Sequence, residues 1–311
     1  MTERMNPADR VFVAGHRGLV GSAILRELKA AGYDQLLTQT RAELNLQDAQ
    51  AVYRWFSIQR PQVVILAAAK VGGIYANSTY PADFIMANLE IQQAVISGAF
   101  HTGVRRLLFL GSSCIYPRMC PQPIREDYLL TGPLEETNRP YALAKLAGLE
   151  LVDSLNRQYG TCYQAVMPTN LYGPNDNFDP LNSHVLPALV RRFVEARKSG
   201  AQDVTVWGTG NSRREFLHSS DLARACHFVL EQTNDTRLLN VGTGVDISIR
   251  DLAELIAELT GFDGTISFDT SKPDGTPRKV LDVSRMTELG WKATISLREG
   301  LKQIIAEYRE R

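Results

Sequence analysis

Cysteine is scarce in this chain of 311 residues. Four cysteines occur and none forms a C-x-x-C pair, namely Cys114, Cys120, Cys162 and Cys226. A zinc site built from paired cysteines is therefore not expected, and we predict that no metal is bound. Four thiols in a chain of this length do not make a disulfide framework either. The pattern favours reduced thiols and a cytoplasmic location.

Long apolar runs and an excess of either charge are also missing. No run of about 18 apolar residues occurs, so no membrane-spanning helix is expected, and the polar start MTERMNPADR shows no secretory signal. The 34 Lys and Arg residues balance 34 Asp and Glu residues. Proteins that bind nucleic acid or membrane surfaces usually carry a basic excess, so we expect neither partner. A local cationic pocket for a small anion is compatible with this balance.

Strand-like and helix-like segments alternate through the first half of the chain. RVFVAG, QVVILAAA and RRLLFLGSS are short and apolar, as parallel strands buried on both faces are. Segments with apolar residues at helical spacing, such as LVGSAILRELKAAGY, separate them. Repeated βα units predict an α/β fold with a doubly wound parallel sheet, the Rossmann architecture.

The composition changes after NLYGPNDNFDP, where Gly, Pro, Asn and Asp indicate a long loop. We predict a Rossmann domain over residues 1–172 and a smaller C-terminal lobe, mainly substrate-binding, over residues 173–311. Segments around 215–245 are expected to return to the first domain.

VAGHRGLVG places Gly15, Gly18 and Gly21 between the first strand and the first helix. Glycines here allow a tight turn, a close approach by a pyrophosphate and close packing of helix on strand. The helix N-terminus adds unpaired N–H groups. The spacing is G-x-x-G-x-x-G rather than the commoner G-x-G-x-x-G. We predict a dinucleotide site at this loop.

The end of the second strand favours NADP(H) as the cofactor. An NAD site normally places Asp or Glu there for the ribose 2′-hydroxyl, whereas this chain has Thr40 and Arg41. A guanidinium suits a 2′-phosphate by its charge and its fork of donors, and Arg17 is a candidate second clamp. Because Glu43 lies two residues on, a solvated surface arginine is the alternative for Arg41.

RPYALAKLAG places Tyr141 and Lys145 four residues apart, on one face of a helix. An ammonium favours tyrosinate, so we expect Lys145 to lower the pKa of Tyr141 toward neutral pH. Such a phenol can exchange a proton with a sugar oxygen while a hydride moves. Ser112, at the carboxyl end of a predicted strand, can donate to the same oxygen. For Y-x-x-x-K alone, a surface pair is the alternative.

The order of GHRGLVG, GSSCIYP, YALAK and MPTNLYGP resembles the extended short-chain dehydrogenase/reductases. LAAAKVGGI, NSHVLPAL, REFLH and SKPDGTPRK make it similar to the members that act on GDP-linked keto sugars, over nearly the whole chain. The resemblance implies that Ser112, Tyr141 and Lys145 form a reduction triad. It also implies that Cys114 and His184 are the acid/base pair of an epimerisation.

The implied reaction is NADPH-dependent 3,5-epimerisation and 4-keto reduction of GDP-4-keto-6-deoxy-D-mannose. A 4-keto group acidifies the C–H bonds at carbons 3 and 5, and a Cys and a His, with free pKa values of about 8.5 and about 6.5, bracket neutral pH. On an extended segment, Ser112 and Cys114 would point to the same side. The alternatives are a buried structural thiol for Cys114 and an ordinary polar residue near a helix start for His184.

The resemblance also implies the binding residues. The expected cofactor contacts are Gly15, Arg17, Gly18, Leu19, Val20, Gly21, Arg41, Leu110, Gly111, Ser112, Tyr141, Lys145, Pro168, Asn170, Leu171 and His184. The expected contacts of the GDP-sugar are Arg192, Trp207, Arg214 and Asp274. The alternatives left open are a core position for Trp207, a solvated helix face for Arg192, and an ion pair between Lys279 and Asp274.

Three other functions compete with this interpretation: a GDP-L-colitose type of reductase, an NAD-retaining nucleotide-sugar epimerase or dehydratase, and a non-catalytic NADP(H)-binding sensor. Arg41 and Cys114 argue against the second, and an intact Ser112, Tyr141 and Lys145 argue against the third. The resemblance also implies a homodimer. ADFIMANLEIQQAVISGAF and the helix of Tyr141 have apolar faces suited to a four-helix interface, although those faces could equally cover the sheet.

Overall fold

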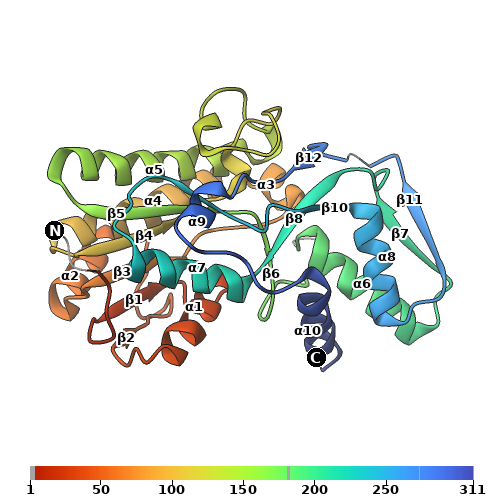
Figure 1. The fold of residues 1–311 in the computed structure, drawn as a ribbon, viewed down its shortest axis with the longest axis horizontal. Helices are drawn as coiled ribbons and strands as arrows, with labels where there is room; N and C mark the ends of the chain where they lie inside the picture. The colour runs from red at the N-terminus through yellow and green to blue at the C-terminus, as the bar shows by residue number, and fades with distance from the viewer. Residues whose placement is uncertain (1–3, 181–182, 273, 311) are drawn as a thin grey trace.

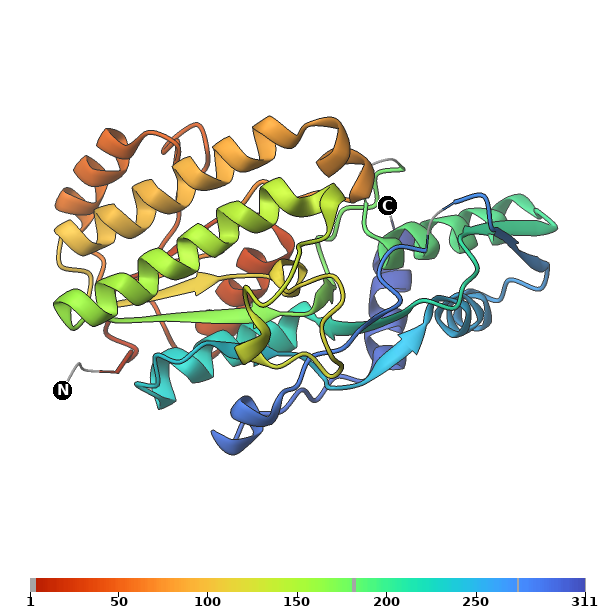
Figure 2. The same ribbon diagram turned by 90° about the horizontal axis from the view of Figure 1, so that it is seen from above.

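The structure is a computed structural model that describes residues 4–180, 183–272 and 274–310. A parallel sheet with helices on both faces forms the larger lobe, and a smaller lobe of short strands and helices extends from one end of it (Figures 1 and 2). Within the described residues, no helix combines the length and apolarity needed to cross a membrane.

The sheet of the larger lobe has the order β2-β1-β3-β4-β5-β9, and every neighbouring pair is parallel. Its strands are β1 (Val11–Ala14), β2 (Leu36–Leu37), β3 (Val63–Leu66), β4 (Arg106–Leu110), β5 (Cys162–Pro168) and β9 (Leu239–Val241). The predicted doubly wound α/β fold is confirmed. The strand order reverses between β1 and β3, and open parallel sheets bind ligands at the carboxyl ends beside such a reversal.

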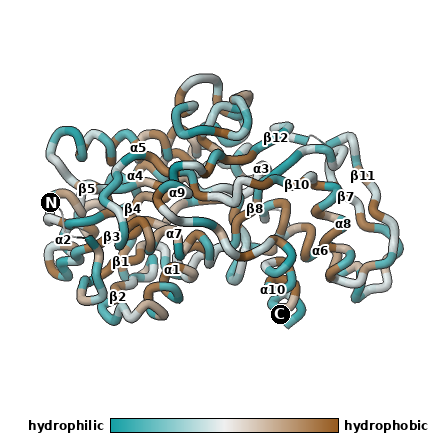
Figure 3. Tube along the Cα trace, viewed as in Figure 1, coloured by the Kyte–Doolittle hydropathy of each residue, from teal (hydrophilic) through white to brown (hydrophobic). Residues whose placement is uncertain are grey.

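Two layers of helices cover this sheet. One face carries α1 (Leu19–Ala30) and α7 (Ser219–Gln232), and the other carries α2 (Ala49–Gln59), α4 (Pro81–His101) and α5 (Arg139–Tyr159). Successive residues of a strand point to opposite faces. Val11 and Val13 accordingly pack toward α1 and α7, and Phe12 toward α2. Both faces are thus apolar, and hydrophobic segments run through the layers in Figure 3.

The smaller lobe has its own core. Its strands are β6 (Asn170–Tyr172), β7 (Asp203–Trp207), β8 (Arg213–His218), β10 (Asp246–Ser248), β11 (Thr265–Asp269) and β12 (Arg278–Lys279), and its helices are α6 (Val185–Ser199), α8 (Ile249–Thr260) and α10 (Leu297–Arg309). β8 is the central strand, pairing with β6, β10 and β12. Phe193, Leu252 and Leu301 bring the three helices into one cluster.

The chain passes repeatedly between the two lobes. After β8, α7 and β9 rejoin the large sheet, and after β12, α9 (Ser284–Glu288) packs against it through Met286. The domain limits at residues 172 and 173 stay a prediction. The remaining helices are α3 (Ile74–Thr79) and the 3₁₀ turns η1 (Ser113–Ile115), η2 (Glu126–Tyr128) and η3 (Glu136–Asn138).

Candidate active site

The glycine loop lies between β1 and α1, as predicted, and two of its glycines are required by packing. Gly15 has φ +89°, and an added Cβ would lie 2.7 Å from the backbone nitrogen of Ala68. A Cβ on Gly21 would overlap the Gly15 carbonyl. At Gly18 it would meet only the Gly15 carbonyl oxygen, at 3.6 Å. Gly18 thus leaves the N-terminus of α1 open, where uncapped N–H groups favour an anion.

The arginines expected to choose the cofactor both have exposed side chains at this edge of the sheet. Arg41 follows β2 and donates to Gln47 at 3.0 Å, and Arg17 is part of the glycine loop. Glu43 accepts from the backbone N–H of Thr40 at 2.7 Å. These bonds from Thr40, followed by the charge of Arg17, lower the pKa of Glu43. Glu43 therefore fixes the turn beside Arg17, and its carboxylate is engaged there.

Ser112 and Cys114 lie together, but not in the extended segment that the sequence suggested. β4 ends at Leu110, and Ser113–Ile115 forms a 3₁₀ turn. Ser112 caps this turn, its Oγ accepting from the backbone N–H of Cys114 at 3.2 Å. The reason given for their proximity was therefore wrong. The turn keeps Cys114 half-buried, with its thiol in hydrogen-bonding contact with Ser112.

Tyr141 and Lys145 share one face of α5, as predicted, but their electrostatics differ from the prediction. The Tyr141 phenol contacts Ser112. Burial raises its pKa, the nearby Cys114 adds to the rise, and the hydrogen bond with Ser112 opposes it. The expected lowering by Lys145 is therefore wrong. Lys145 donates to the carbonyl of Leu110 at 2.8 Å, and burial lowers its own pKa to about 8.

A lysine from the smaller lobe completes the surroundings of Cys114. The Nζ of Lys279, on β12, donates to the Sγ of Cys114 at 3.3 Å. Burial by itself would raise the pKa of the Cys114 thiol. The charge of Lys279, with hydrogen bonds from Ser112 and Lys279 and the charge of Arg214, outweighs burial, and the pKa is lowered. Cys114 is therefore not an inert core thiol.

His184 stands immediately before α6 with an extended backbone. The residue is exposed, yet the protein packed around its ring desolvates it enough to lower its pKa, and the charge of Lys279 adds to this lowering. Lys279 thus acts electrostatically on both residues expected to exchange protons with the sugar.

Two of the expected sugar-nucleotide residues, Arg192 and Trp207, lie farther out on the smaller lobe. Trp207 is 59% exposed at the end of β7, so the alternative of a core position is wrong. The guanidinium of Arg192 lies 5.5 Å from its ring centroid and also donates to the carbonyl of Thr205 at 2.9 Å. Arg192 and Trp207 help line a cavity of about 430 Å³. A cation beside an exposed aromatic ring suits a nucleotide.

Asp274 holds a turn in place. Its carboxylate accepts from the N–H and the hydroxyl of Thr209, each at 2.8 Å. Arg214 donates to the backbone carbonyl of Asp274 at 3.3 Å and acts electrostatically on Cys114. The alternative in which Lys279 pairs with Asp274 is not what the structure shows, because Lys279 turns to Cys114. Arg214 thus links the smaller lobe to the thiol.

The remaining expected cofactor contacts follow the carboxyl ends of β4 and β5. Gly111 bonds through its N–H to Val166 and packs against Met167 so closely that a Cβ would overlap the sulfur. Asn170 donates from its side-chain amide to the carbonyl of Glu215 at 2.7 Å. The strand ends therefore bring these backbones to the same edge as the glycine loop. Pro168 and Leu171, like Leu19 and Val20, stay predicted contacts.

Sequence reasoning missed Lys279 and Glu215. Glu215 is fully buried and accepts from the backbone N–H groups of Thr243, Gly244 and Leu281, the last at 2.8 Å. Its place in REFLH gives a weak signal, since a carboxylate inside an apolar strand needs partners. Lys279 carries no such signal, because Asp274 and Asp282 lie within five residues of it and make a local ion pair the simpler interpretation.

The fold and this arrangement of groups are those of a Rossmann-type enzyme that uses a nucleotide cofactor. The chain belongs to the NAD dependent epimerase/dehydratase family, whose family model matches residues 11–242. The resemblance to the extended short-chain dehydrogenase/reductases is therefore confirmed.

Relatives similar to this chain cover nearly all of it. GDP-L-fucose synthase 1 of Arabidopsis thaliana is 56% identical over 294 residues, 94% of this chain and 91% of that protein. GDP-L-fucose synthase of Escherichia coli strain K12 is 56% identical over 301 residues, 94% of each. GDP-L-colitose synthase of Yersinia pseudotuberculosis is 36% identical, over 94% of this chain and 96% of that protein.

A solved structure with cofactor is also similar. MlghC, a GDP-mannoheptose C4 reductase from Campylobacter jejuni with NADP bound, superimposes with a TM-score of 0.89 at 35% identity. The match covers 99% of this chain and 100% of that chain.

Proposed function

We propose that this chain catalyses NADPH-dependent 3,5-epimerisation and 4-keto reduction of GDP-4-keto-6-deoxy-D-mannose to GDP-L-fucose. The observation that carries the proposal is the contact of one serine with both a half-buried thiol and a phenol: Ser112 with Cys114 and Tyr141. One hydroxyl then serves two chemistries on neighbouring carbons. The two relatives at 56% identity support the choice of sugar over the colitose type, whose relative is 36% identical.

The residues present fit NADP(H). Gly15 and Gly21 leave no room for side chains, Gly18 opens the N-terminus of α1 to a pyrophosphate, and Arg17 and Arg41 suit a 2′-phosphate. NADPH, when bound, supplies the hydride for the 4-keto carbon. The NADP-bound neighbour supports this assignment, and Arg41 disfavours an NAD-retaining epimerase.

Epimerisation is assigned to Cys114 and His184. The Cys114 thiolate removes a proton from a ring carbon beside the keto group, and the electron pair moves onto the keto oxygen. Ser112 and Tyr141 donate hydrogen bonds to that oxygen as charge develops on it. His184 returns a proton to the ring, and its exposure allows it to be reloaded from water.

Reduction is assigned to Tyr141. Because its pKa is raised, the phenol is protonated at neutral pH, as an acid for the 4-oxygen must be. Ser112 holds the same oxygen, so one pair of donors serves both steps. Lys145, bonded to the carbonyl of Leu110, fixes the end of β4 against α5.

We further propose a homodimer formed through α4 and α5. Both helices cover the sheet with one side and expose large apolar residues on the other, including Met86 at 57% and Leu143 at 45% exposure. A symmetric four-helix contact would bury them. The four free thiols fit a cytoplasmic location.

Incubation of the protein with GDP-4-keto-6-deoxy-D-mannose and NADPH tests the function. We expect one NADPH oxidised per sugar and GDP-L-fucose as the product identified by NMR. A product sugar without inversion at carbons 3 and 5, or turnover without net NADPH consumption, would refute the proposal. Incubation of the same mixture without the protein is the control for non-enzymatic change.

A further inference from the structure

The steps above leave unused the charged group that is hydrogen-bonded to the thiol. Lys279 donates to the Sγ of Cys114 at 3.3 Å from a different lobe. β12, which carries Lys279, pairs in parallel with β8, and the register places Lys279 opposite Arg214. Two cationic side chains of the smaller lobe therefore approach a thiol of the larger lobe.

Hydrogen bonds between the two neighbouring segments hold this approach in place. The backbone N–H of Ile124 donates to the carbonyl of Val280 and that of Asp282 donates to the carbonyl of Ile124, each at 2.8 Å. The side chain of Gln122 accepts from the N–H of Val280 at 2.9 Å. The segment after Lys279 is thus bound to the segment that follows the Cys114 turn.

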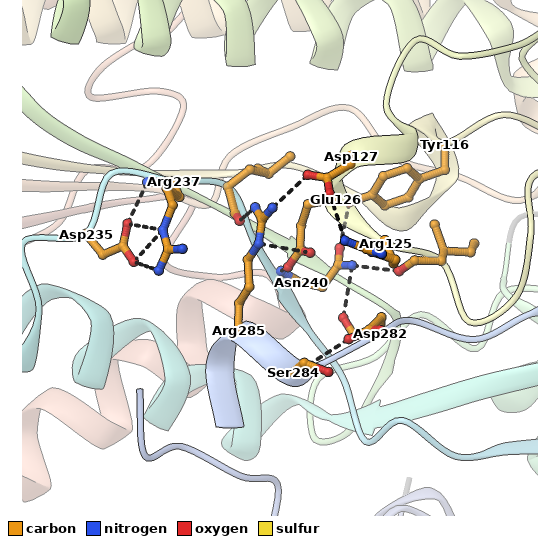
Figure 4. Close-up of polar contacts among 12 residues, drawn as sticks. Tyr116, Arg125, Glu126, Asp127, Asp235, Arg237, Asn240, Asp282, Ser284 and Arg285 are labelled. Atoms are coloured by element: carbon orange, nitrogen blue, oxygen red, sulfur yellow. Dashed lines mark hydrogen bonds and ion pairs between the residues drawn. The ribbon is translucent and has the colours of Figure 1, made fainter. Parts of the chain in front are cut away.

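Asn240 lies between the same two segments and bonds to both (Figure 4). It is fully buried, and its side-chain amide donates to the carbonyls of Ile124 at 2.9 Å and Asp282 at 3.1 Å. Its Oδ1 accepts from the hydroxyl of Tyr116, two residues after Cys114, at 2.7 Å. Hydrogen bonds therefore hold the segments next to both Lys279 and Cys114. A chance contact between two surface side chains would lack these bonds.

The titratable and charged groups that act on the sulfur come from three elements. Lys279 on β12 and Arg214 on β8 bring positive charge, and Tyr141 on α5 is a neutral phenol. His184, before α6, shares the influence of Lys279. A cation at hydrogen-bonding distance favours the thiolate over the thiol.

We propose that Lys279 is a positioning residue that keeps Cys114 in the thiolate form for proton abstraction. This inference rests on the proposed function, since it explains how that base is charged before substrate binds. In the step itself the S–H bond forms, a ring C–H bond breaks, and the electron pair passes to the keto oxygen. The ammonium stays protonated throughout and is no proton donor to the sugar.

The test measures Cys114 ionisation without cofactor or substrate. Alkylation of Cys114 by iodoacetamide is followed against pH, with the Cys114 peptide quantified by mass spectrometry. Lys279→Met removes the charge, Lys279→Arg keeps it, and Lys302→Met, an exposed lysine on α10, is the control. We expect the pH midpoint to rise by about 1–3 units in Lys279→Met, and to stay near the wild-type value in the other two.

The same variants are then compared by wash-in of solvent deuterium into the substrate without NADPH. At pH 7, the rate of wash-in should be lower in Lys279→Met than in the wild type by about tenfold or more. Each unit by which the pKa of Cys114 rises above pH 7 lowers the fraction of thiolate about tenfold. An unchanged alkylation midpoint in Lys279→Met overturns the inference, even if its KM for the GDP-sugar rises. An equal rise in Lys279→Arg also overturns it.

Failure of the proposed function has a different signature. Wild-type protein that washes no deuterium into GDP-4-keto-6-deoxy-D-mannose contradicts the function, whatever the midpoint of alkylation is. Normal wash-in by wild-type protein with an unshifted midpoint in Lys279→Met contradicts only the role of Lys279.

Discussion

The ammonium of Lys145 lies 6.0 Å from the ring centroid of Tyr141, one turn earlier on α5. Lys145 is buried and donates to the carbonyl of Leu110 at the end of β4. The lysine therefore connects the helix of the phenol to the strand that leads into Ser112. Burying a cation opposes folding. Replacing Lys145 should therefore change stability and activity in opposite directions.

Lys145→Met should stabilise the fold while slowing NADPH oxidation, because the end of β4 that leads to Ser112 loses its hydrogen bond to α5. Burial lowers the folded-state pKa from 10.5 to about 8, so below pH 8 the charged form costs about 3 kcal/mol. Loss of the hydrogen bond to Leu110 offsets about 1 kcal/mol of this gain. The free energy of unfolding of Lys145→Met, measured in urea at pH 7, should therefore exceed that of the wild type by about 2 kcal/mol.

The pH dependence of this effect has a defined sign. Between about pH 8 and 10.5 Lys145 is more fully protonated in the unfolded state than in the folded state. The contribution of this group to the free energy of unfolding of the wild type therefore rises with pH. The difference between wild type and Lys145→Met should therefore shrink across that window. A constant difference would contradict the lowered pKa of Lys145.

Tyr141→Phe should lower the rate of NADPH oxidation by about 10²–10⁴-fold, the usual contribution of a positioned acid. Deuterium wash-in at the ring should persist at a reduced rate, because Ser112 still holds the oxygen. Stopped-flow absorbance at the nicotinamide band measures the first quantity. Undiminished oxidation would remove Tyr141 from the reaction.

Cys114→Ser should slow deuterium wash-in by about 10²-fold or more, since a hydroxyl is a far weaker base than a thiolate. NADPH binding, followed by fluorescence titration, should not change. Cys120→Ser, at a half-buried thiol outside the site, is the matched control. Wild-type exchange in Cys114→Ser would assign the base to another group.

Arg41→Ala should raise the KM for NADPH by about 10- to 100-fold, because hydrogen bonds to charged groups contribute about 1.5–3 kcal/mol. The KM for NADH should stay the same, since NADH has no 2′-phosphate. Arg54→Ala, an exposed arginine on α2, should behave as wild type. A parallel rise for both cofactors would show that Arg41 supports the turn and does not select NADP.

Asn240→Ala should lower the free energy of unfolding by about 3–5 kcal/mol, because three buried hydrogen bonds are lost together. Tyr116→Phe removes only one of them and should cost about 1–2 kcal/mol. Urea unfolding measures both. Equal losses would mean that the links from Asn240 to Ile124 and Asp282 contribute little.

The sequence predicted the large sheet well because its strands are buried on both faces and separated by clear helical periodicity, as in Val11–Ala14 and Val63–Leu66. Tyr141 and Lys145 were placed on one helix face by spacing alone. The turn at Ser113–Ile115 was not foreseen, since Gly111 and Ser112 end the apolar run without indicating which backbone conformation follows.

The contact of Lys279 with Cys114 could not be predicted from local pattern. The two residues lie 165 positions apart and meet through tertiary packing. The direction of the pKa shift of Tyr141 could not be predicted from the sequence either. The balance between burial and nearby charge depends on how deeply the phenol is buried in the folded protein. The order of motifs identified the site, whereas the electrostatics needed the structure.

The most direct test of the central claim is the reaction of GDP-4-keto-6-deoxy-D-mannose with NADPH in deuterium oxide, with NMR of the product. If the thiol and the phenol act on one sugar, the GDP-L-fucose formed carries deuterium at carbons 3 and 5 and protium at carbon 4. A reduced product that has protium at both carbons 3 and 5 would contradict the account.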